Sequence, residues 1–534
     1  MEMSPESRQV PAGVTPREVF VLSDLHLGGR YPSRVDNTDP GFRMMNQAAQ
    51  LATLLDGWAT RDVRVDPCEV IINGDFVDFL AEEEPDRPDP NQPWRVFYGD
   101  ASQAARILEQ VMSRDAAVFD ALAKLVGRGH VLTILLGNHD LELSLPLVRE
   151  ALAHRLGLPD ERCLRFIYDG EAYPIGDTLI EHGNRYDRYN QVRFDDLREL
   201  RSLQSRRQAV EWTDWFTPPP GSFLVVEIMN RLKRQYPFID LLKPEKDAVM
   251  PLLLALEPAL ADLMDHLLWT LLPGHTTYGT RLFRPSLPSH RSTIAAASAD
   301  RPESLAGALS PLFSYRSEWE AFCSSLFPAI QTRPDWMRPA GTTRQAIAGG
   351  AEGSTGLTAW WKKLRQLTER LRASSATGLI YLNPADQEAR LPALRTALRI
   401  LRHDRSFDAS HEEPAYLDAA RELAQVGGFR HIVFGHTHLA KENISLGKDP
   451  SYWNTGTFCD LMRVPEEIIG SDDEAAMSML RQWIDSLTDP NRRGREWIGH
   501  DLTYLSMRVR SDGQTTMHRL VHHSTTWHGS ASSR

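Results

Sequence analysis

Five short segments of the sequence carry side chains of the kind that bind divalent cations. They contain carboxylate, amide and imidazole groups, which are the donors of a mixed oxygen and nitrogen metal site. The segments are Ser23-Asp24-Leu25-His26, Gly74-Asp75-Phe76-Val77-Asp78, Gly137-Asn138-His139-Asp140, Glu181-His182-Gly183 and Gly435-His436-Thr437-His438. Together they hold enough ligands for two cations.

Two adjacent cations suit the hydrolysis of a phosphate ester. This reaction needs hydroxide at neutral pH and positive charge facing the attacking and leaving oxygens, and two cations roughly 3.5–4 Å apart supply both. The side chains that fit such a site are Asp24, His26, Asp75, Asn138, His182, His436 and His438. His436 and His438 are two residues apart, so an extended loop points them to one side. His139 is left over beside Asn138 and is free to protonate a leaving oxygen.

Each segment follows an apolar, β-branched run and is therefore expected just beyond the carboxyl end of a strand. The pattern predicts strands at 19–23, 70–73, 131–136, 164–168, 178–181 and 431–434, helices at 44–58 and 101–126, and a closing hairpin of 502–510 with 515–522. Open α/β sheets gather their functional residues at that edge. The alternation of strands and helices predicts a layered α/β sandwich.

A predominantly helical region interrupts this alternation. We predict that residues 1–195 and 425–525 form the two parts of one core. Residues 196–424 form an inserted helical cap, and residues 526–534 form a disordered tail. The insert begins and ends beside metal-binding loops, so its helices are expected near the opening of the site. Its most apolar portion, 223–272, is explained by helices that pack into a hydrophobic core within the insert. An apolar groove for a lipid tail, or a lid on a membrane surface, is the alternative.

The five segments, in this order, resemble the calcineurin-like metallophosphoesterase superfamily. Its pattern runs D-x-H, G-D-x-x-D, G-N-H-D/E, a lone His and G-H-x-H, and no position of it is missing here. The resemblance covers about 17–190 and 428–523. It implies a sandwich of two central sheets flanked by helices, with a large insertion between its two parts.

The resemblance also implies a role for each ligand. The first cation would be held by Asp24, His26 and His438, and the second by Asn138, His182 and His436. Asp75 would bridge the two cations, and His139, oriented by Asp78, would act as general acid or stabilise the transition state. Mixed oxygen and nitrogen ligands accept manganese, iron, zinc or cobalt. Of these we expect manganese.

A finer resemblance concerns the substrate. The opening Ser-Asp-Leu-His-Leu-Gly and the stretch 181–187 are similar to the branch that contains the UDP-2,3-diacylglucosamine hydrolases, which cleave a pyrophosphate in a nucleotide-linked lipid. Those enzymes are about half as long, with a small helical lid in place of the large insert. The resemblance therefore implies a phosphodiester or pyrophosphate bond in a nucleotide- or lipid-linked substrate, and leaves the substrate itself open.

Charge and composition describe an ordinary globular enzyme. The net charge of −11 argues against a broadly basic nucleic-acid surface. Arg185 and Arg188 adjoin His182 and are the candidates for binding a substrate phosphate. Further arginines in a helix after the fourth segment alternate with acidic residues, which favours a solvated surface. The four cysteines are far apart, and no signal peptide or membrane span is visible. We expect a cytoplasmic protein, with peripheral membrane contact as an alternative and the oligomeric state open.

Three functional classes remain. The first is a dinuclear metal-dependent hydrolase of phosphodiester or pyrophosphate bonds. The second is a nuclease acting on DNA or RNA, which predicts a basic groove and salt-sensitive binding. The third is a scaffold that retains the fold without catalysis, and the full set of seven ligands together with His139 argues against it.

Overall fold

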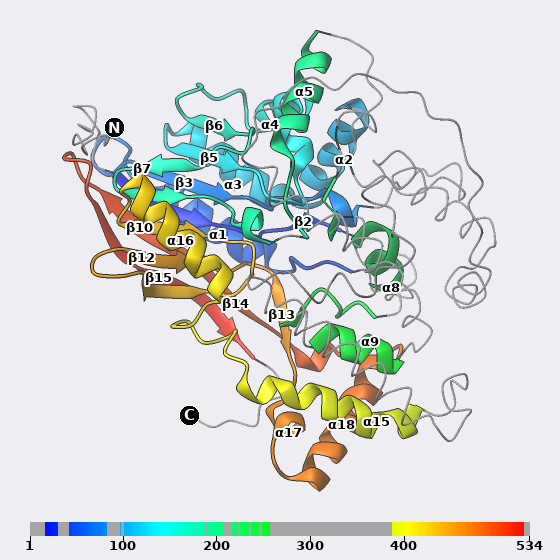
Figure 1. The fold of residues 1–534 in the computed structure, drawn as a ribbon. Helices are drawn as coiled ribbons and strands as arrows, with labels where there is room; N and C mark the ends of the chain where they lie inside the picture. Colours follow the sequence, from blue (N-terminus) through cyan, green and yellow to red (C-terminus); the bar gives the residue numbers. More distant parts are fainter. Residues whose placement is uncertain are drawn as a thin grey trace, which may run out of the picture.

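The computed structural model describes residues 17–29, 42–82, 97, 101–187, 189–206 and 387–527, and parts of 216–256. These residues form a mixed α/β fold with two large sheets and several helices (Figure 1). The expected α/β class is confirmed. The tail beyond residue 527 lies outside the described residues. None of the described helices combines the length and apolar character needed to cross a membrane.

The first sheet has eight strands. Its order is β6 (Leu164–Ile167), β5 (Val131–Leu135), β3 (Cys68–Asn73), β1 (Arg17–Leu22), β14 (Ile498–Val509), β13 (Asp460–Arg463) and β9 (Leu242–Lys243), with β15 (Thr515–Thr526) paired to β14. Strands β1, β3, β5 and β6 are parallel, whereas β14 runs antiparallel to β1. The carboxyl ends of the four parallel strands therefore lie at one edge.

The second sheet has five strands. Its order is β11 (Lys441–Ser445), β12 (Ser451–Asn454), β10 (His431–Phe434), β8 (Thr178–Ile180) and β7 (Tyr173–Ile175). Strands β8, β10 and β12 are parallel, so their carboxyl ends also share an edge. A short parallel pair, β2 (Leu27–Gly28) with β4 (Val77–Asp78), lies just after β1 and β3.

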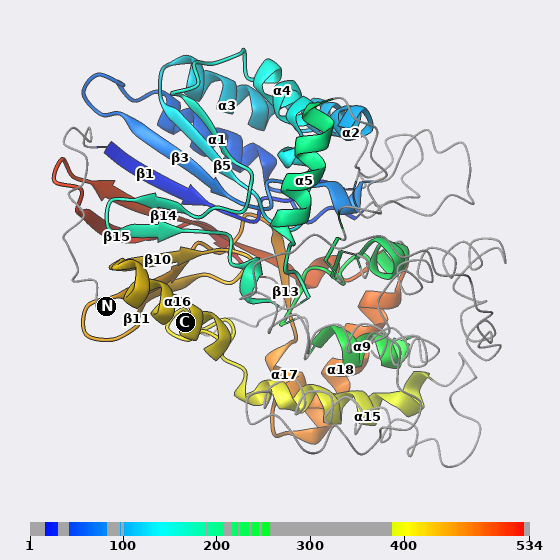
Figure 2. The ribbon, with the colours of Figure 1, turned by 45° about the horizontal axis from the view of Figure 1, so that its top comes forward.

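The two sheets pack face to face, with helices on their outer faces (Figure 2). Successive side chains of a strand point to opposite faces. In β3, Ile71 lies in the cluster between the sheets with Val433 of β10, while Val70 and Ile72 lie in the larger cluster with helices α1 (Ala48–Ala59) and α3 (Ala116–Gly127). Helix α16 (Pro414–Gly427) covers the outer face of the second sheet, where Tyr416 packs with Ile432.

The helices that surround the sheets are mostly short. The longer ones are α1 (Ala48–Ala59), α2 (Ala101–Arg114), α3 (Ala116–Gly127), α4 (Pro146–Arg155), α5 (Phe194–Ser205), α15 (Gln387–Leu398), α16 (Pro414–Gly427) and α18 (Asp473–Thr488). The shorter ones are η1 (Phe79–Ala81), η2 (Leu141–Ser144), η3 (Asn184–Tyr186), η4 (Val225–Met229), α8 (Asn230–Lys233), α9 (Met250–Leu256), η10 (Arg399–His403), α17 (Glu466–Ile469) and η11 (Arg495–Trp497).

The predicted strands all form, each within two residues of its expected start, except that β14 begins four residues earlier than predicted. The single helix predicted at 101–126 is wrong, because it divides into α2 and α3 at Asp115. Asp115 is buried and its carboxylate accepts two hydrogen bonds from the Arg43 guanidinium, at 2.8 and 3.1 Å. That tertiary ion pair has no signature in the local sequence.

Described parts of 196–424 share their core with the rest of the chain. Strand β9 completes the first sheet beside β13. Helices α9 and α15 pack with α17 and α18 at one end of the molecule (Figures 1 and 2), and Leu252, Leu394 and Trp483 belong to the main hydrophobic cluster. Helix α16 belongs with the second sheet. Of the apolar portion 223–272, the structure describes residues up to 256. The buried leucines in this described part belong to the same core.

Candidate metal centre

The five motif segments converge where the carboxyl ends of both sheets meet. Asp24, Asp75 and Asn138 follow β1, β3 and β5 of the first sheet, whereas His182 and His436 follow β8 and β10 of the second. Backbone hydrogen bonds join the loops, from Asp24 N to Gly74 O at 3.2 Å and from Gly435 N to His182 O at 2.9 Å. The predicted convergence on one edge is what the structure shows.

Five of the predicted ligands have a left-handed backbone that non-glycine residues rarely adopt. The positive φ angles are 53° at Asp24, 42° at His26, 51° at Asp75, 70° at His436 and 61° at His438. Each such residue costs of order 1–3 kcal/mol and persists only where the surrounding structure holds it. Strain of this kind is found at functional sites, so its clustering on the candidate ligands supports these loops as a candidate site.

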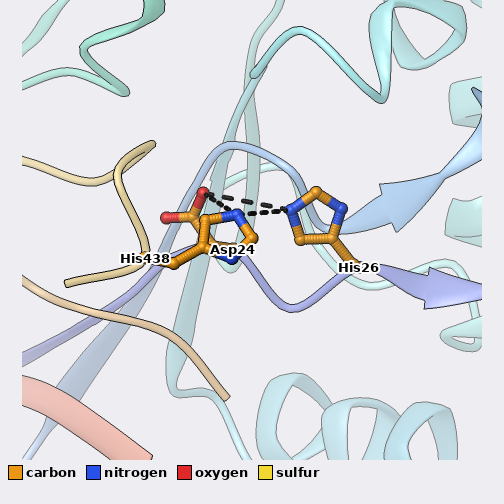
Figure 3. A group of neighbouring side chains, drawn as sticks. All are labelled: Asp24, His26 and His438. Atoms are coloured by element: carbon orange, nitrogen blue, oxygen red, sulfur yellow. Dashed lines mark hydrogen bonds and ion pairs between the residues drawn. The ribbon is translucent and has the colours of Figure 1, made fainter. Parts of the chain in front are cut away.

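The first group of ligands comprises Asp24, His26 and His438 (Figure 3). His438 Nε2 lies 3.4 Å from Asp24 Oδ1, and His26 Nε2 lies 3.1 Å from His438 Nε2. All three residues are buried, and one ligand atom from each lies within 4.8 Å of the others. This group could hold a metal ion.

A second group comprises Asp75, His182 and His436, and meets the same 4.8 Å criterion. Asp75 Oδ2 lies 3.2 Å from His182 Nε2 and 3.6 Å from His26 Nε2, so one carboxylate oxygen faces both groups. His26 and Asp75 form a further group with His139. The two groups are thus contiguous, with Asp75 between them.

Buried oxygens at the centre test whether a cation fits. Asp24 Oδ1 and Asn138 Oδ1 are both buried, and neither accepts a hydrogen bond from any described residue. A buried polar atom without a partner costs about 1–3 kcal/mol. Carboxylate and amide oxygens are donors that a divalent cation accepts, so a cation bound to this centre would satisfy both atoms.

The electrostatics of the centre also favour a cation. Burial by itself lowers the pKa of the His182 imidazole, but the carboxylates of Asp75 and Asp24 outweigh it and raise this pKa to about 10. His182 Nδ1 lies 2.8 Å from the carbonyl oxygen of Asn73. Donation from Nδ1 to that carbonyl would fix the ring and leave Nε2, which faces Asp75, as the atom that could bind a metal ion.

Residues that hold the loops were not identified from the sequence. The Asp140 carboxylate accepts hydrogen bonds from Gly137 N at 2.7 Å and Phe76 N at 2.8 Å, which ties the second segment to the third. Asp187 Oδ2 lies 3.2 Å from His436 Nε2. Asp140 could have been identified from the sequence, because it lies inside the third segment. Asp187 could not, because its position beside His436 depends on the turn after η3.

His139 and Asp78 form a hydrogen-bonded pair beside the ligands. His139 Nδ1 lies 2.8 Å from Asp78 Oδ1, and Asp78 Oδ2 lies 3.5 Å from His26 Nδ1. Burial lowers the pKa of His139, but the charges of Asp78 and Asp75 outweigh burial and raise it to about 9. Burial opposes ionisation of Asp78, and the charge of His139 holds its pKa well below the usual range.

Of the two arginines expected to bind a substrate phosphate, the structure describes Arg185 alone. Arg188 lies outside the described residues. Arg185 is half exposed and lines a small pocket together with His182. Its guanidinium donates to Gly170 O at 2.7 Å and lies 3.8 Å from Glu181 Oε2. In α5, Arg198 pairs with Asp195 at 2.5 Å, as expected for a solvated helix.

No model of a protein family matches the sequence, and no curated protein matches it. The case for a function therefore depends on the residues and on the geometry of the centre.

Proposed function

We propose that this protein is a metal-dependent phosphoesterase of the calcineurin-like type, with two divalent cations held between its sheets. The observation that carries the proposal is the position of Asp75, whose Oδ2 faces His182 Nε2 at 3.2 Å and His26 Nε2 at 3.6 Å. A carboxylate placed between two ligand groups can bridge two cations. The substrate class is a phosphodiester or pyrophosphate.

The ligands divide between the two cations as the motif resemblance implies. One cation would be held by Asp24, His26 and His438, and the other by Asn138, His182 and His436, with Asp75 shared. When bound, the cations supply a nucleophile at neutral pH and positive charge facing the reacting oxygens. The mixed donor set accepts manganese, iron, zinc or cobalt, and we expect manganese.

His139 supplies the proton in this proposal. The carboxylates of Asp78 and Asp75 raise the pKa of this imidazole and so favour its protonated form. Asp78 accepts from Nδ1, which leaves Nε2–H as the group that can donate to a leaving oxygen. The proton passes from Nε2 to that oxygen as the phosphorus–oxygen bond breaks, and the imidazole recovers it from solvent.

Nuclease activity is the second candidate, because the same centre could hydrolyse a nucleic-acid backbone. A nuclease needs a basic surface that follows the phosphates. Arg193, just before helix α5, is paired with Asp196 at 2.9 Å, and Arg198 within α5 is paired with Asp195 at 2.5 Å. The net charge of −11 does not favour such a surface either. We therefore rank hydrolysis of a smaller substrate first.

Metal analysis combined with a substrate panel tests the proposal. We expect two cations per chain in the purified protein. Hydrolysis of bis-p-nitrophenyl phosphate should be lost when a chelator removes them, and restored by manganese, iron, zinc or cobalt. Asp75→Asn should weaken both metal sites, whereas His26→Ala should mainly damage one. Asp120→Asn, at an exposed ion pair with Arg155, is the matched control. Two tightly bound cations persisting in Asp75→Asn would contradict the assignment.

A further inference from the structure

Residues 455–459 carry the chain from the second sheet to the first. They join β12 to β13, and β12 is parallel to β10, so this connection leaves the second sheet at the edge where the candidate ligands lie. Its polar side chains at Thr455, Thr457 and Cys459 are fully buried. Buried polar groups almost always form hydrogen bonds, so the partners of these side chains indicate what the connection does.

The connection begins against the loop 435–438, which carries two of the candidate histidine ligands. Asn454, the last residue of β12, donates from Nδ2 to Gly435 O at 2.8 Å and to Thr437 Oγ1 at 3.1 Å. Its Oδ1 accepts from Gly456 N at 3.0 Å. Asn454 therefore ties the loop to the connection.

The connection then contacts the first motif segment. Thr455 Oγ1 lies 2.6 Å from Ser23 Oγ, and Thr457 Oγ1 donates to Asp24 O at 2.7 Å. Cys459 Sγ donates to the same carbonyl oxygen at 3.3 Å, but a thiol is a weaker donor than a hydroxyl. The Thr457 hydroxyl is therefore the main side-chain partner of the Asp24 carbonyl.

The Asp24 backbone needs such a partner. Its positive φ of 53° is uncommon for a residue with a side chain and persists only where the surrounding structure holds it. Of its carboxylate oxygens, Oδ2 accepts from His436 N at 2.9 Å, whereas Oδ1 is buried, has no hydrogen-bond partner among the described residues, and lies 3.4 Å from His438 Nε2. A shift of the Asp24 backbone would therefore move Oδ1 away from His438.

We propose that Thr457 is a positioning residue for the first cation, because its hydroxyl holds the Asp24 carbonyl and so keeps Asp24 Oδ1 where it can bind metal. Thr457 is not itself assigned as a ligand, since Oγ1 donates to Asp24 O and accepts from Cys459 N at 3.0 Å. This inference rests on the proposed function, because it concerns the affinity for one of the two cations.

Calorimetric titration of the metal-free protein with manganese or zinc tests the inference through two dissociation constants. His26→Ala and His182→Ala identify which constant belongs to which ligand group. Thr457→Val keeps the shape of the side chain and removes the hydroxyl. We expect the constant of the first group to rise by roughly 10- to 100-fold, as for loss of a group that orients a metal ligand, and the other constant to change far less. Thr457→Ser keeps the hydroxyl and should keep the affinity.

Thr133→Val is the control for loss of a buried threonine hydroxyl. Thr133 is fully buried and donates to Glu69 Oε1 at 2.7 Å. This variant should melt at a lower temperature with both constants unchanged. If Thr457→Val does not fold, Thr457→Ala provides the variant without a hydroxyl.

Three outcomes would overturn the inference: an unchanged first constant without the hydroxyl, an equal rise in both constants, or weakened binding in Thr457→Ser. Each of them leaves the two cations of the wild type in place. A wild type that binds neither two manganese nor two zinc ions would refute the proposed function instead.

Discussion

One carboxylate, Asp78, contacts both the candidate acid and a candidate metal ligand. Its Oδ1 lies 2.8 Å from Nδ1 of His139, and its Oδ2 lies 3.5 Å from Nδ1 of His26. The His139 and His26 rings meet edge to face, with centroids 4.7 Å apart. Asp78 therefore holds the candidate proton donor His139 beside the candidate ligand His26.

His139→Ala separates proton transfer from metal binding. Because no ligand role is assigned to His139, the variant should keep its cations and lose on the order of 10²–10⁴-fold in turnover rate, the usual contribution of a positioned acid. Substrates with very good leaving groups should lose less. Rates on p-nitrophenyl and alkyl phosphodiesters, together with metal content, check this. An equal loss on both substrates would indicate charge stabilisation in place of proton donation.

Gly137→Ala should abolish metal binding without removing any ligand. A Cβ atom at residue 137 would lie 2.0 Å from Asp75 Oδ1 and 2.5 Å from Asp75 N, so the bridging carboxylate must move. Metal content should fall at both sites. Gly127→Ala is the control, because a Cβ atom there meets nothing within 4 Å. Normal metal content in Gly137→Ala would mean that Asp75 does not bridge in the position described.

Glu82 should make stability depend on pH. Burial raises its pKa to about 7, despite the Arg114 guanidinium at 2.6 Å. Its folded pKa exceeds the ordinary value of 4.5, so its stabilising contribution is complete below pH 4.5 and is lost as pH rises towards 7. The free energy of unfolding of the wild type relative to Glu82→Gln should therefore fall across this window, by at most about 1.4 kcal/mol per pH unit.

Urea unfolding of both proteins at several pH values measures this difference. Comparison with Glu82→Gln subtracts the titration of all other groups, since only residue 82 differs. A difference that rises with pH would show that attraction to Arg114 outweighs burial, and that the pKa of Glu82 is lowered.

Leu394→Ala tests whether the helical part near α15 is integral to the fold. Leu394 is 1% exposed and belongs to the main hydrophobic cluster. Truncation of a buried leucine costs about 2–5 kcal/mol. We expect a single unfolding transition with that loss, followed by both circular dichroism and tryptophan fluorescence. Val426→Ala, at a side chain 82% exposed, should change stability by less than about 0.5 kcal/mol. A separate early transition in Leu394→Ala would show an independent unit.

The sequence by itself determined the strands and the chemistry that follows them. Apolar, β-branched runs produced β1, β3, β5, β8 and β10 near their expected residues. Parallel strands share one edge, so residues just after them must approach one another, and seven candidate ligands could be named from local pattern alone. Local periodicity is sufficient here because strand formation and loop position depend on neighbouring residues.

Tertiary structure decided the features that join distant segments. Asp115, between α2 and α3, accepts hydrogen bonds from Arg43, Asp187 lies beside His436, and β9 pairs with β13. Each relationship connects residues at least 70 positions apart and adds no periodic signal to either segment. Burial and charged partners from other segments also set pKa values, as for His139 beside Asp78. These properties arise only when the chain has folded.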